Sequence, residues 1–110
     1  LNPSNIIAYY ERSWLKMNPR IKDFDGGITD MRQILILDPY NVERILDLAT
    51  IYNLANKNRE AVKILKTAID IEPENGNLYF WRGVYKNWHQ YPSGCRDIRK
   101  SKKLRYFSWC

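Results

Sequence analysis

Two residue types with catalytic potential lie near the carboxyl end of the chain. His89 is the only histidine, and Cys95 follows it six residues later. A cysteine nucleophile needs a histidine within hydrogen-bond reach and a third group that orients the imidazole. His89 lies in the stretch NWHQYP, which is typical of a helix end or a turn. A break between helices is therefore expected between His89 and Cys95. The spacing does not support a cysteine–histidine pair.

Other potential sites for chemistry are also incomplete. Two cysteines and one histidine are too few for a structural zinc site, which needs four closely spaced ligands. Gly26 and Gly27 are not followed by the Gly-Lys-Ser/Thr of a phosphate loop. Asp23 and Asp25 flank a turn, where carboxylates are usually solvated. We therefore predict a protein that is not an enzyme and uses no cofactor and no metal.

Positive charge gathers at the carboxyl end. The chain holds 18 Lys and Arg against 12 Asp and Glu, a formal net charge of +6, and residues 94–110 contribute most of it. On a helix, side chains three and four residues apart share a face. A stripe that could bind phosphates is formed by Arg96, Arg99, Lys100 and Lys103. A solvated charged face is the commoner explanation, so binding of nucleic acid or another anionic surface is the alternative function.

The overall composition is that of one globular domain. At 110 residues, with 45% hydrophobic and 27% charged residues, the chain is long enough for a modest core. No apolar run approaches the roughly 20 residues of a membrane span. No secretory signal is visible, although the chain begins at Leu1 and a preceding segment could be missing. Its compartment stays open, with a slight preference for the cytoplasm.

A signal of four residues recurs along the chain: NPSN at 2–5, DPYN at 38–41 and EPEN at 72–75. Between the last two signals, small and apolar residues follow helical spacing on both sides of a polar turn at 56–58. Proline stops each second helix, and Asn5, Asn41 and Asn75 are placed to cap the helices that follow. Each unit is therefore a helix, a turn and a second helix that must stack on its neighbours.

The middle unit resembles the tetratricopeptide repeat (TPR). The resemblance rests on Ile45, Leu48, Ala49, Tyr52, Ala61, Leu65, Ala68 and Pro73. Flanking units match more loosely, through Tyr9, Ser13 and Gly27 and through Tyr79, Gly83 and Gly94, with two residues inserted near Pro19. The resemblance implies an all-α, right-handed superhelical solenoid of three repeats (about 2–37, 38–71 and 72–105) and a tail at 106–110. We expect one domain over 1–110, a bacterial source and a fragment of a longer array.

Six helices are expected at about 5–18, 25–37, 42–55, 58–71, 76–89 and 93–105. In proteins with this repeat, the first helix of each pair lines a concave groove that holds a peptide or a helix of a protein partner. By resemblance the groove residues are Tyr10, Trp14, Met17, Leu46, Asp47, Thr50, Asn53, Asn77, Phe80 and Trp81, joined by Ile7, Glu43, Leu54 and Val84.

Some proteins of this family hold a terminal carboxylate with Lys, Asn and Arg side chains in the groove. The matching positions here are Tyr10, Trp14, Asp47, Asn77 and Trp81, so a carboxylate clamp is disfavoured and an apolar or aromatic ligand is expected. Self-association through an uncapped carboxyl end and a purely structural role within a longer array are further possibilities. The sequence does not identify the partner.

Overall fold

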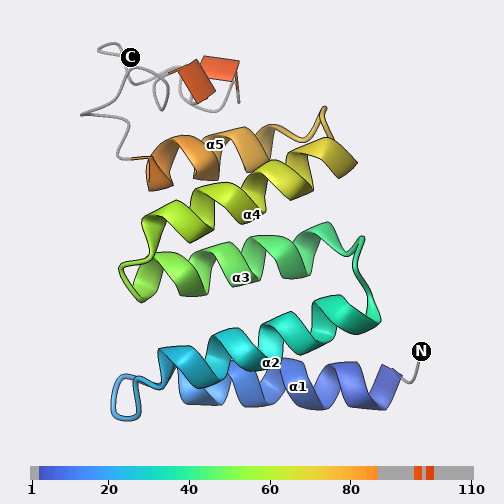
Figure 1. Ribbon diagram of the computed structural model, residues 1–110, viewed down its shortest axis with the longest axis vertical. Coiled ribbons are helices and arrows are strands. Elements are labelled where there is room, and N and C mark those ends of the chain that lie inside the picture. The colour runs from blue at the N-terminus through green and yellow to red at the C-terminus, as the bar shows by residue number, and fades with distance from the viewer. Residues whose placement is uncertain (1–2, 87–95, 98, 101–110) are drawn as a thin grey trace.

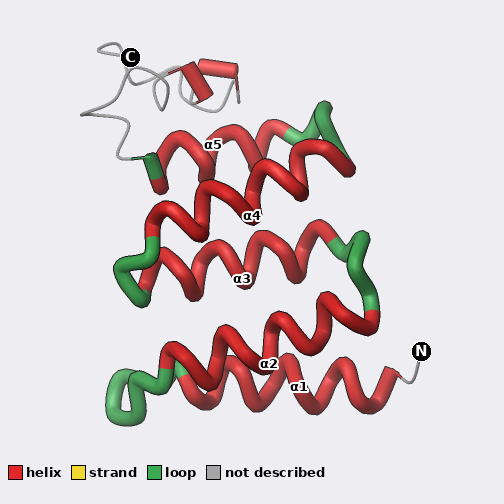
Figure 2. Tube along the Cα trace, viewed as in Figure 1, coloured by secondary structure: helices red, strands yellow, loops and turns green. Residues whose placement is uncertain are grey.

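The computed structural model describes residues 3–86, 96–97 and 99–100. Five α-helices are described: α1 (Pro3–Lys16), α2 (Phe24–Leu37), α3 (Val42–Leu54), α4 (Asn58–Ile71) and α5 (Gly76–Tyr85). Figure 1 shows them stacked in sequence order, each folding back on the one before it. Helices account for all the regular structure in the described residues, and Figure 2 shows only short loops between them. The predicted all-α class is confirmed.

Two complete helix pairs, α1–α2 and α3–α4, are followed by α5. The predicted sixth helix at 93–105 lies mostly outside the described residues, although residues 96–97 and 99–100 are helical. Five of the six expected helices lie within the described residues. The division into three complete repeats stays a prediction.

The repeated four-residue signal connects one helix pair to the next. Asn41 and Asn75 cap α3 and α5, each accepting a bond from a first-turn N–H, at 3.2 Å and 3.1 Å. Each amide also donates back to the acid that opens the signal, Asn41 to Asp38 (3.1 Å) and Asn75 to Glu72 (3.0 Å). The acid and the asparagine thus lock the turn around the proline, and two of the three predicted caps are confirmed.

The cap predicted at Asn5 is wrong. Helix α1 begins at Pro3, so Asn5 lies inside its first turn. Proline is well suited to a helix start because its fixed φ matches the helix and its missing N–H would have no partner there. The other predicted boundaries are close, except that α1 ends at Lys16 and α5 at Tyr85, earlier than expected.

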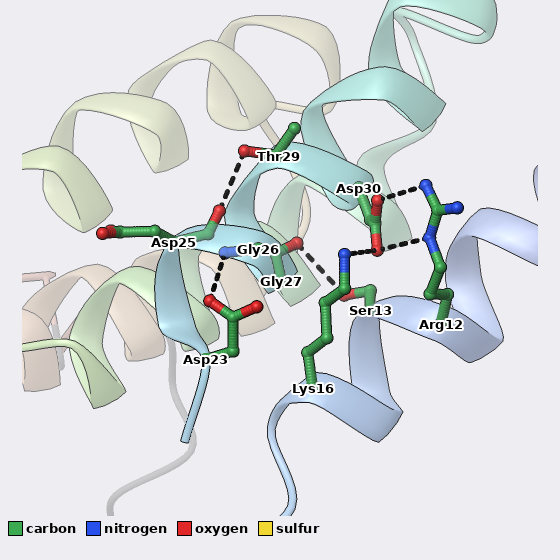
Figure 3. Close-up of polar contacts among 9 residues, drawn as sticks. All are labelled: Arg12, Ser13, Lys16, Asp23, Asp25, Gly26, Gly27, Thr29 and Asp30. Carbon is green, nitrogen blue, oxygen red and sulfur yellow. Dashed lines mark hydrogen bonds and ion pairs between the residues drawn. The ribbon is translucent and has the colours of Figure 1, made fainter. Parts of the chain in front are cut away.

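The expected insertion near Pro19 forms the loop between α1 and α2. Lys22 in this loop adopts a positive φ of 48°. Asp23 then caps α2 by accepting a hydrogen bond from the N–H of Gly26 at 2.9 Å (Figure 3). The loop therefore ends in a sharp turn fixed by a side-chain cap, which sets where α2 starts against α1.

The core consists of two connected clusters. One joins α3, α4 and α5 around Ala49, Ala61 and Ala68, which are fully buried. The other joins α2 and α3, with aromatic side chains of α1 packed against it. Small side chains at the crossing points let the helix backbones approach closely. Ser13 and Gly27 play this part between α1 and α2, where the Ser13 hydroxyl donates to the Gly27 carbonyl at 3.2 Å.

Candidate functional site

A buried carboxylate fixes α1 on α2. Asp30 accepts hydrogen bonds from Nε and Nη2 of Arg12, at 3.0 Å and 2.7 Å, and forms an ion pair with Lys16 at 3.0 Å (Figure 3). Its side chain is only 3% exposed. These hydrogen bonds, chiefly that from Arg12, lower the pKa of the Asp30 carboxyl despite its burial. Two cations of α1 are thereby directed to α2.

The third unit has the same arrangement of one arginine, one lysine and one aspartate. Asp97 accepts hydrogen bonds from Nε and Nη2 of Arg82, at 2.9 Å and 2.7 Å, and pairs with Lys86 at 2.9 Å. Burial raises the pKa of the Asp97 carboxyl, but the bonds from Arg82 and Lys86 outweigh it and the net pKa is lowered. In both units the arginine and lysine are four residues apart, on one helix face.

The middle unit has an apolar set in the same places. Leu48, Tyr52 and Ile64 stand where the outer units have Arg, Lys and Asp. Leu48 is buried in the second cluster, and Tyr52 and Ile64 pack against both clusters. The same structural role is therefore filled by an ion cluster in each outer unit and by hydrophobic contacts in the middle unit.

Aromatic side chains of α1 and α5, linked by polar side chains of α3, form a row across the first helices. On α1, the Tyr10 and Trp14 rings meet edge to face, with centroids 6.2 Å apart. The Arg44 guanidinium of α3 lies over the Tyr10 ring, 4.0 Å from its centroid. This cation–π contact joins α1 to α3 across the row.

The row continues from α3 to α5. Thr50 Oγ1 and the Tyr85 hydroxyl are hydrogen-bonded at 3.2 Å, and burial raises the pKa of that hydroxyl. Trp81 lies beside Tyr85 with ring centroids 5.8 Å apart, and Phe80 meets Trp81 edge to face at 5.0 Å. Tyr85 itself is buried in the core and is only 4% exposed. We call the surface of α1, α3 and α5 that carries Tyr10, Trp14, Asp47, Thr50, Phe80 and Trp81 the first-helix face.

One carboxylate lies within the row. Asp47 pairs with Arg44 at 2.9 Å and is half-buried. Burial raises the pKa of the Asp47 carboxyl, and the Arg44 charge opposes that rise. Arg44 also lies 3.5 Å from Glu43, whose side chain is 85% exposed. The single guanidinium is therefore shared between a tyrosine ring and two acids.

An open apolar depression of about 500 Å³ lies on α1 at one end of the row. It is lined by Tyr10, Glu11, Trp14, Leu15 and Asn18. The Trp14 Nε1–H is buried and has no acceptor among the described residues. A buried indole N–H normally finds a partner, so this donor is an unsatisfied polar group beside the depression.

The structure brings most of the sequence-predicted groove residues onto this face. Tyr10, Trp14, Asp47, Thr50, Phe80 and Trp81 belong to the row. Asn77 is exposed in the first turn of α5, and Asn53 is half-buried near the end of α3. Leu46 packs partly into the core, and Met17 lies toward α2, where its Sδ would be 3.0 Å from a Cβ added at Gly27. We therefore leave Met17 out of the face.

Sequence reasoning missed two members of the row, Arg44 and Tyr85. Tyr85 follows Trp81 by four residues, and this helical spacing is a signal that could have found it. Arg44 could not be assigned in the same way, because a cation in the first turn of a helix usually points into water. Its contact with Tyr10 depends on how closely α1 and α3 stack.

The predicted basic stripe is only partly described. Arg96, Arg99 and Lys100 are exposed, and Lys100 Nζ lies 4.6 Å from the centroid of the Tyr79 ring. Lys103 lies outside the described residues, as do both cysteines and His89. In the part that is described, no group of three His, Cys, Asp or Glu side chains could hold a metal ion, and no helix is long and apolar enough to cross a membrane.

Two solved structures share this arrangement of helices. One is the crystal structure of MamA protein. The alignment covers 94% of this chain and 56% of the MamA chain, with a TM-score of 0.78 and 21% sequence identity. The first TPR of Spaghetti (RPAP3), bound to the HSP90 peptide SRMEEVD, aligns with 96% of this chain and 82% of its own, with a TM-score of 0.77 and 16% identity. The chain has the tetratricopeptide-repeat fold.

Sequence similarity is more limited. The mouse protein Sperm-associated antigen 1 is 35% identical over 69 residues, which are 63% of this chain. The chain spans only 7% of the length of that relative. No family model matches the sequence. The expected bacterial source and the expected longer array stay predictions.

Proposed function

We propose that this TPR chain is a non-catalytic interaction scaffold that binds a peptide or a helix of a protein partner on its first-helix face. The observation that carries the proposal is the set of aromatic side chains on α1 and α5, which α3 links through Arg44, over the Tyr10 ring, and Thr50, bonded to the Tyr85 hydroxyl. Aromatic side chains offer large apolar surfaces and are common anchors at protein interfaces. A row of them on one surface supports a protein ligand.

The row is also held in place before a ligand arrives. Tyr10 is fixed between Trp14 and Arg44, and Tyr85 between Thr50 and Trp81. Side chains that are already ordered lose less conformational entropy on binding, which leaves more of the contact energy as affinity. The exposed end of the row, Trp81, is 36% accessible and gives a partner its most direct contact.

A solved neighbour with the same fold is bound to a peptide, which supports this class of function. Its likeness to this chain lies in the fold, so the partner of this chain has to be argued from the chain's own residues. The sequence-based alternative, an anionic surface bound by the basic stripe, gains no support from the exposed Arg96 and Arg99 alone. It stays a prediction, as do a single domain over 1–110, self-association and the absence of catalysis.

The experiment is a titration with a panel of short synthetic peptides of mixed apolar and charged pattern, followed by fluorescence anisotropy. Trp81→Ala should weaken binding about tenfold or more, because it removes the most exposed aromatic contact of the row. Tyr40→Ala is the matched control, since Tyr40 is an exposed aromatic residue in the loop between α2 and α3. Equal affinities for the two variants, or no binding by any peptide, would contradict the proposal.

A further inference from the structure

We infer that the first-helix face selects a cationic peptide, one in which lysine or arginine side chains alternate with apolar ones. This inference rests on the proposed function and adds the chemistry of the partner. It comes from the way the charges of α1, α3 and α5 are distributed, and not from the aromatic row alone.

The first step concerns the cations. Every lysine and arginine of α1, α3 and α5 is already held in an ion pair within the fold. The pairs are Arg12 and Lys16 with Asp30, Arg44 with Asp47, and Arg82 with Asp97. The pairs in the outer units direct their cations to the second helices. On α1, α3 and α5, no lysine or arginine is therefore left without an acidic partner and free to pair with an acidic ligand.

The second step concerns the acids. Glu11 lines the depression beside Trp14, and Glu43 and Asp47 flank Arg44 on α3. Three carboxylates on this face thus stand against one guanidinium, although the whole chain carries a net charge of +6. At physiological ionic strength charges are screened beyond about 8 Å, so the local excess of acid decides which ligand is attracted.

The third step concerns the rings. Tyr10 already binds a guanidinium on its face, at 4.0 Å from Arg44. Trp81, with part of its surface exposed, offers a similar platform to a cation of the partner. The Trp14 ring lines the depression and adds a further apolar surface beside Glu11. Rings beside carboxylates are suited to a long cationic side chain, because its stem is apolar and its head is charged.

The same arrangement argues against an acidic peptide such as SRMEEVD, which the RPAP3 domain binds. Its carboxylates would approach Glu11 and Glu43, and the one nearby guanidinium is shared between Tyr10, Asp47 and Glu43. Like charges placed together across an interface reduce affinity and exclude the wrong partner. The face therefore has a charge preference opposite to that of a carboxylate clamp.

The experiment compares two synthetic peptides with the same alternating apolar residues, one with lysine and one with glutamate between them, and adds SRMEEVD as a third probe. Binding to the whole chain is measured by fluorescence anisotropy at low and at physiological ionic strength. The lysine peptide should bind roughly tenfold more tightly than the glutamate peptide, with a margin that shrinks as salt is added. SRMEEVD should bind as weakly as the glutamate peptide.

Two variants locate the effect. Glu11→Gln with Glu43→Gln should remove most of the preference for lysine while preserving the shapes of the side chains. Glu60→Gln is the matched control, because Glu60 is an exposed acid on α4, away from the first-helix face.

The outcomes separate the two proposals. Equal binding of both alternating peptides, lost in Trp81→Ala, would keep the proposed function and overturn the charge preference. Tighter binding of the glutamate peptide or of SRMEEVD would also overturn it. A lysine preference that survives in Glu11→Gln/Glu43→Gln would show that the acids of this face do not select the ligand. Binding of none of the three peptides would contradict both proposals.

Discussion

Asp30 of α2 receives two hydrogen bonds from the Arg12 guanidinium of α1, and Arg82 and Asp97 reproduce the same paired geometry in the third unit. In each unit a lysine four residues after the arginine completes the cluster. These clusters help set how the outer helix pairs pack, and they pair the cations of the first helices with acids of the fold. The packing of the repeat and the chemistry of its surface are therefore linked.

The first prediction concerns Asp30→Asn. The change keeps the shape of the side chain but leaves Arg12 and Lys16 without a counter-charge. Breaking a fully buried pair costs about 3–5 kcal/mol, and Arg12 remains 56% exposed, so we expect a loss of about 2 kcal/mol in the free energy of unfolding. Urea denaturation followed by circular dichroism measures it. Glu60→Gln should leave the urea midpoint of the parent chain unchanged. A midpoint for Asp30→Asn equal to that of the parent chain would contradict the role of Asp30.

The second prediction transfers the residues of the middle unit to the first. The triple variant Arg12→Leu, Lys16→Tyr and Asp30→Ile replaces the ion cluster with the apolar set found at Leu48, Tyr52 and Ile64. Well-packed hydrophobic replacements of buried ion clusters are often neutral or stabilising. We expect a free energy of unfolding within about 1 kcal/mol of the parent chain, although Asp30→Asn alone destabilises it.

The comparison is made by the same urea denaturation. If the triple variant lost as much stability as the sum of its single substitutions, the two kinds of cluster would not be equivalent. Non-additivity in the expected direction would show that the outer and middle units fill one structural role with different chemistry.

The third prediction concerns pH. The pKa values of Asp30 and Asp97 are lowered in the folded chain, below the value of about 3.9 for an unfolded aspartate. Their ionised forms therefore stabilise the fold above that value, and this stabilisation is lost as the pH falls through about 4 and below. The pKa of Asp47 is raised, so its contribution has the opposite sign and partly offsets the loss.

The free energy of unfolding should consequently change little between about pH 7 and pH 5 and decrease at lower pH. Asp30→Asn should have a shallower acid dependence than the parent chain, and Asp47→Asn a steeper one. Urea titrations at a series of pH values measure all three proteins. An acid dependence that is unchanged in Asp30→Asn would contradict the assignment.

Most of the fold could be predicted from the sequence, because the repeat depends on local signals. Helical spacing located α3 and α4 within one residue, and Asn41 of the four-residue signal marked the start of α3. The start of α1 could not be found in this way, because Asn5 has the residue type of a cap but Pro3 precedes it with a backbone already suited to a helix.

The candidate site was predicted less completely. Aromatic residues on the first helices are visible in the sequence, and helical spacing places them on one face. The burial of Asp30 is not visible, because a charged residue at a helix surface is usually solvated. Its partners Arg12 and Lys16 come from another helix, so their meeting depends on how α1 packs against α2. Only the structure shows that these cations are paired with Asp30.

The central claim is that the first-helix face binds a segment of a protein partner. Amide chemical-shift mapping by NMR, with the lysine-containing alternating peptide added to the isotope-labelled chain, tests it most directly. We predict that the perturbed amides cluster on α1, α3 and α5 around Tyr10, Asp47 and Trp81, and that Trp81→Ala greatly reduces the shifts. Perturbations confined to α2 and α4, or shifts unaffected by Trp81→Ala, would contradict the account.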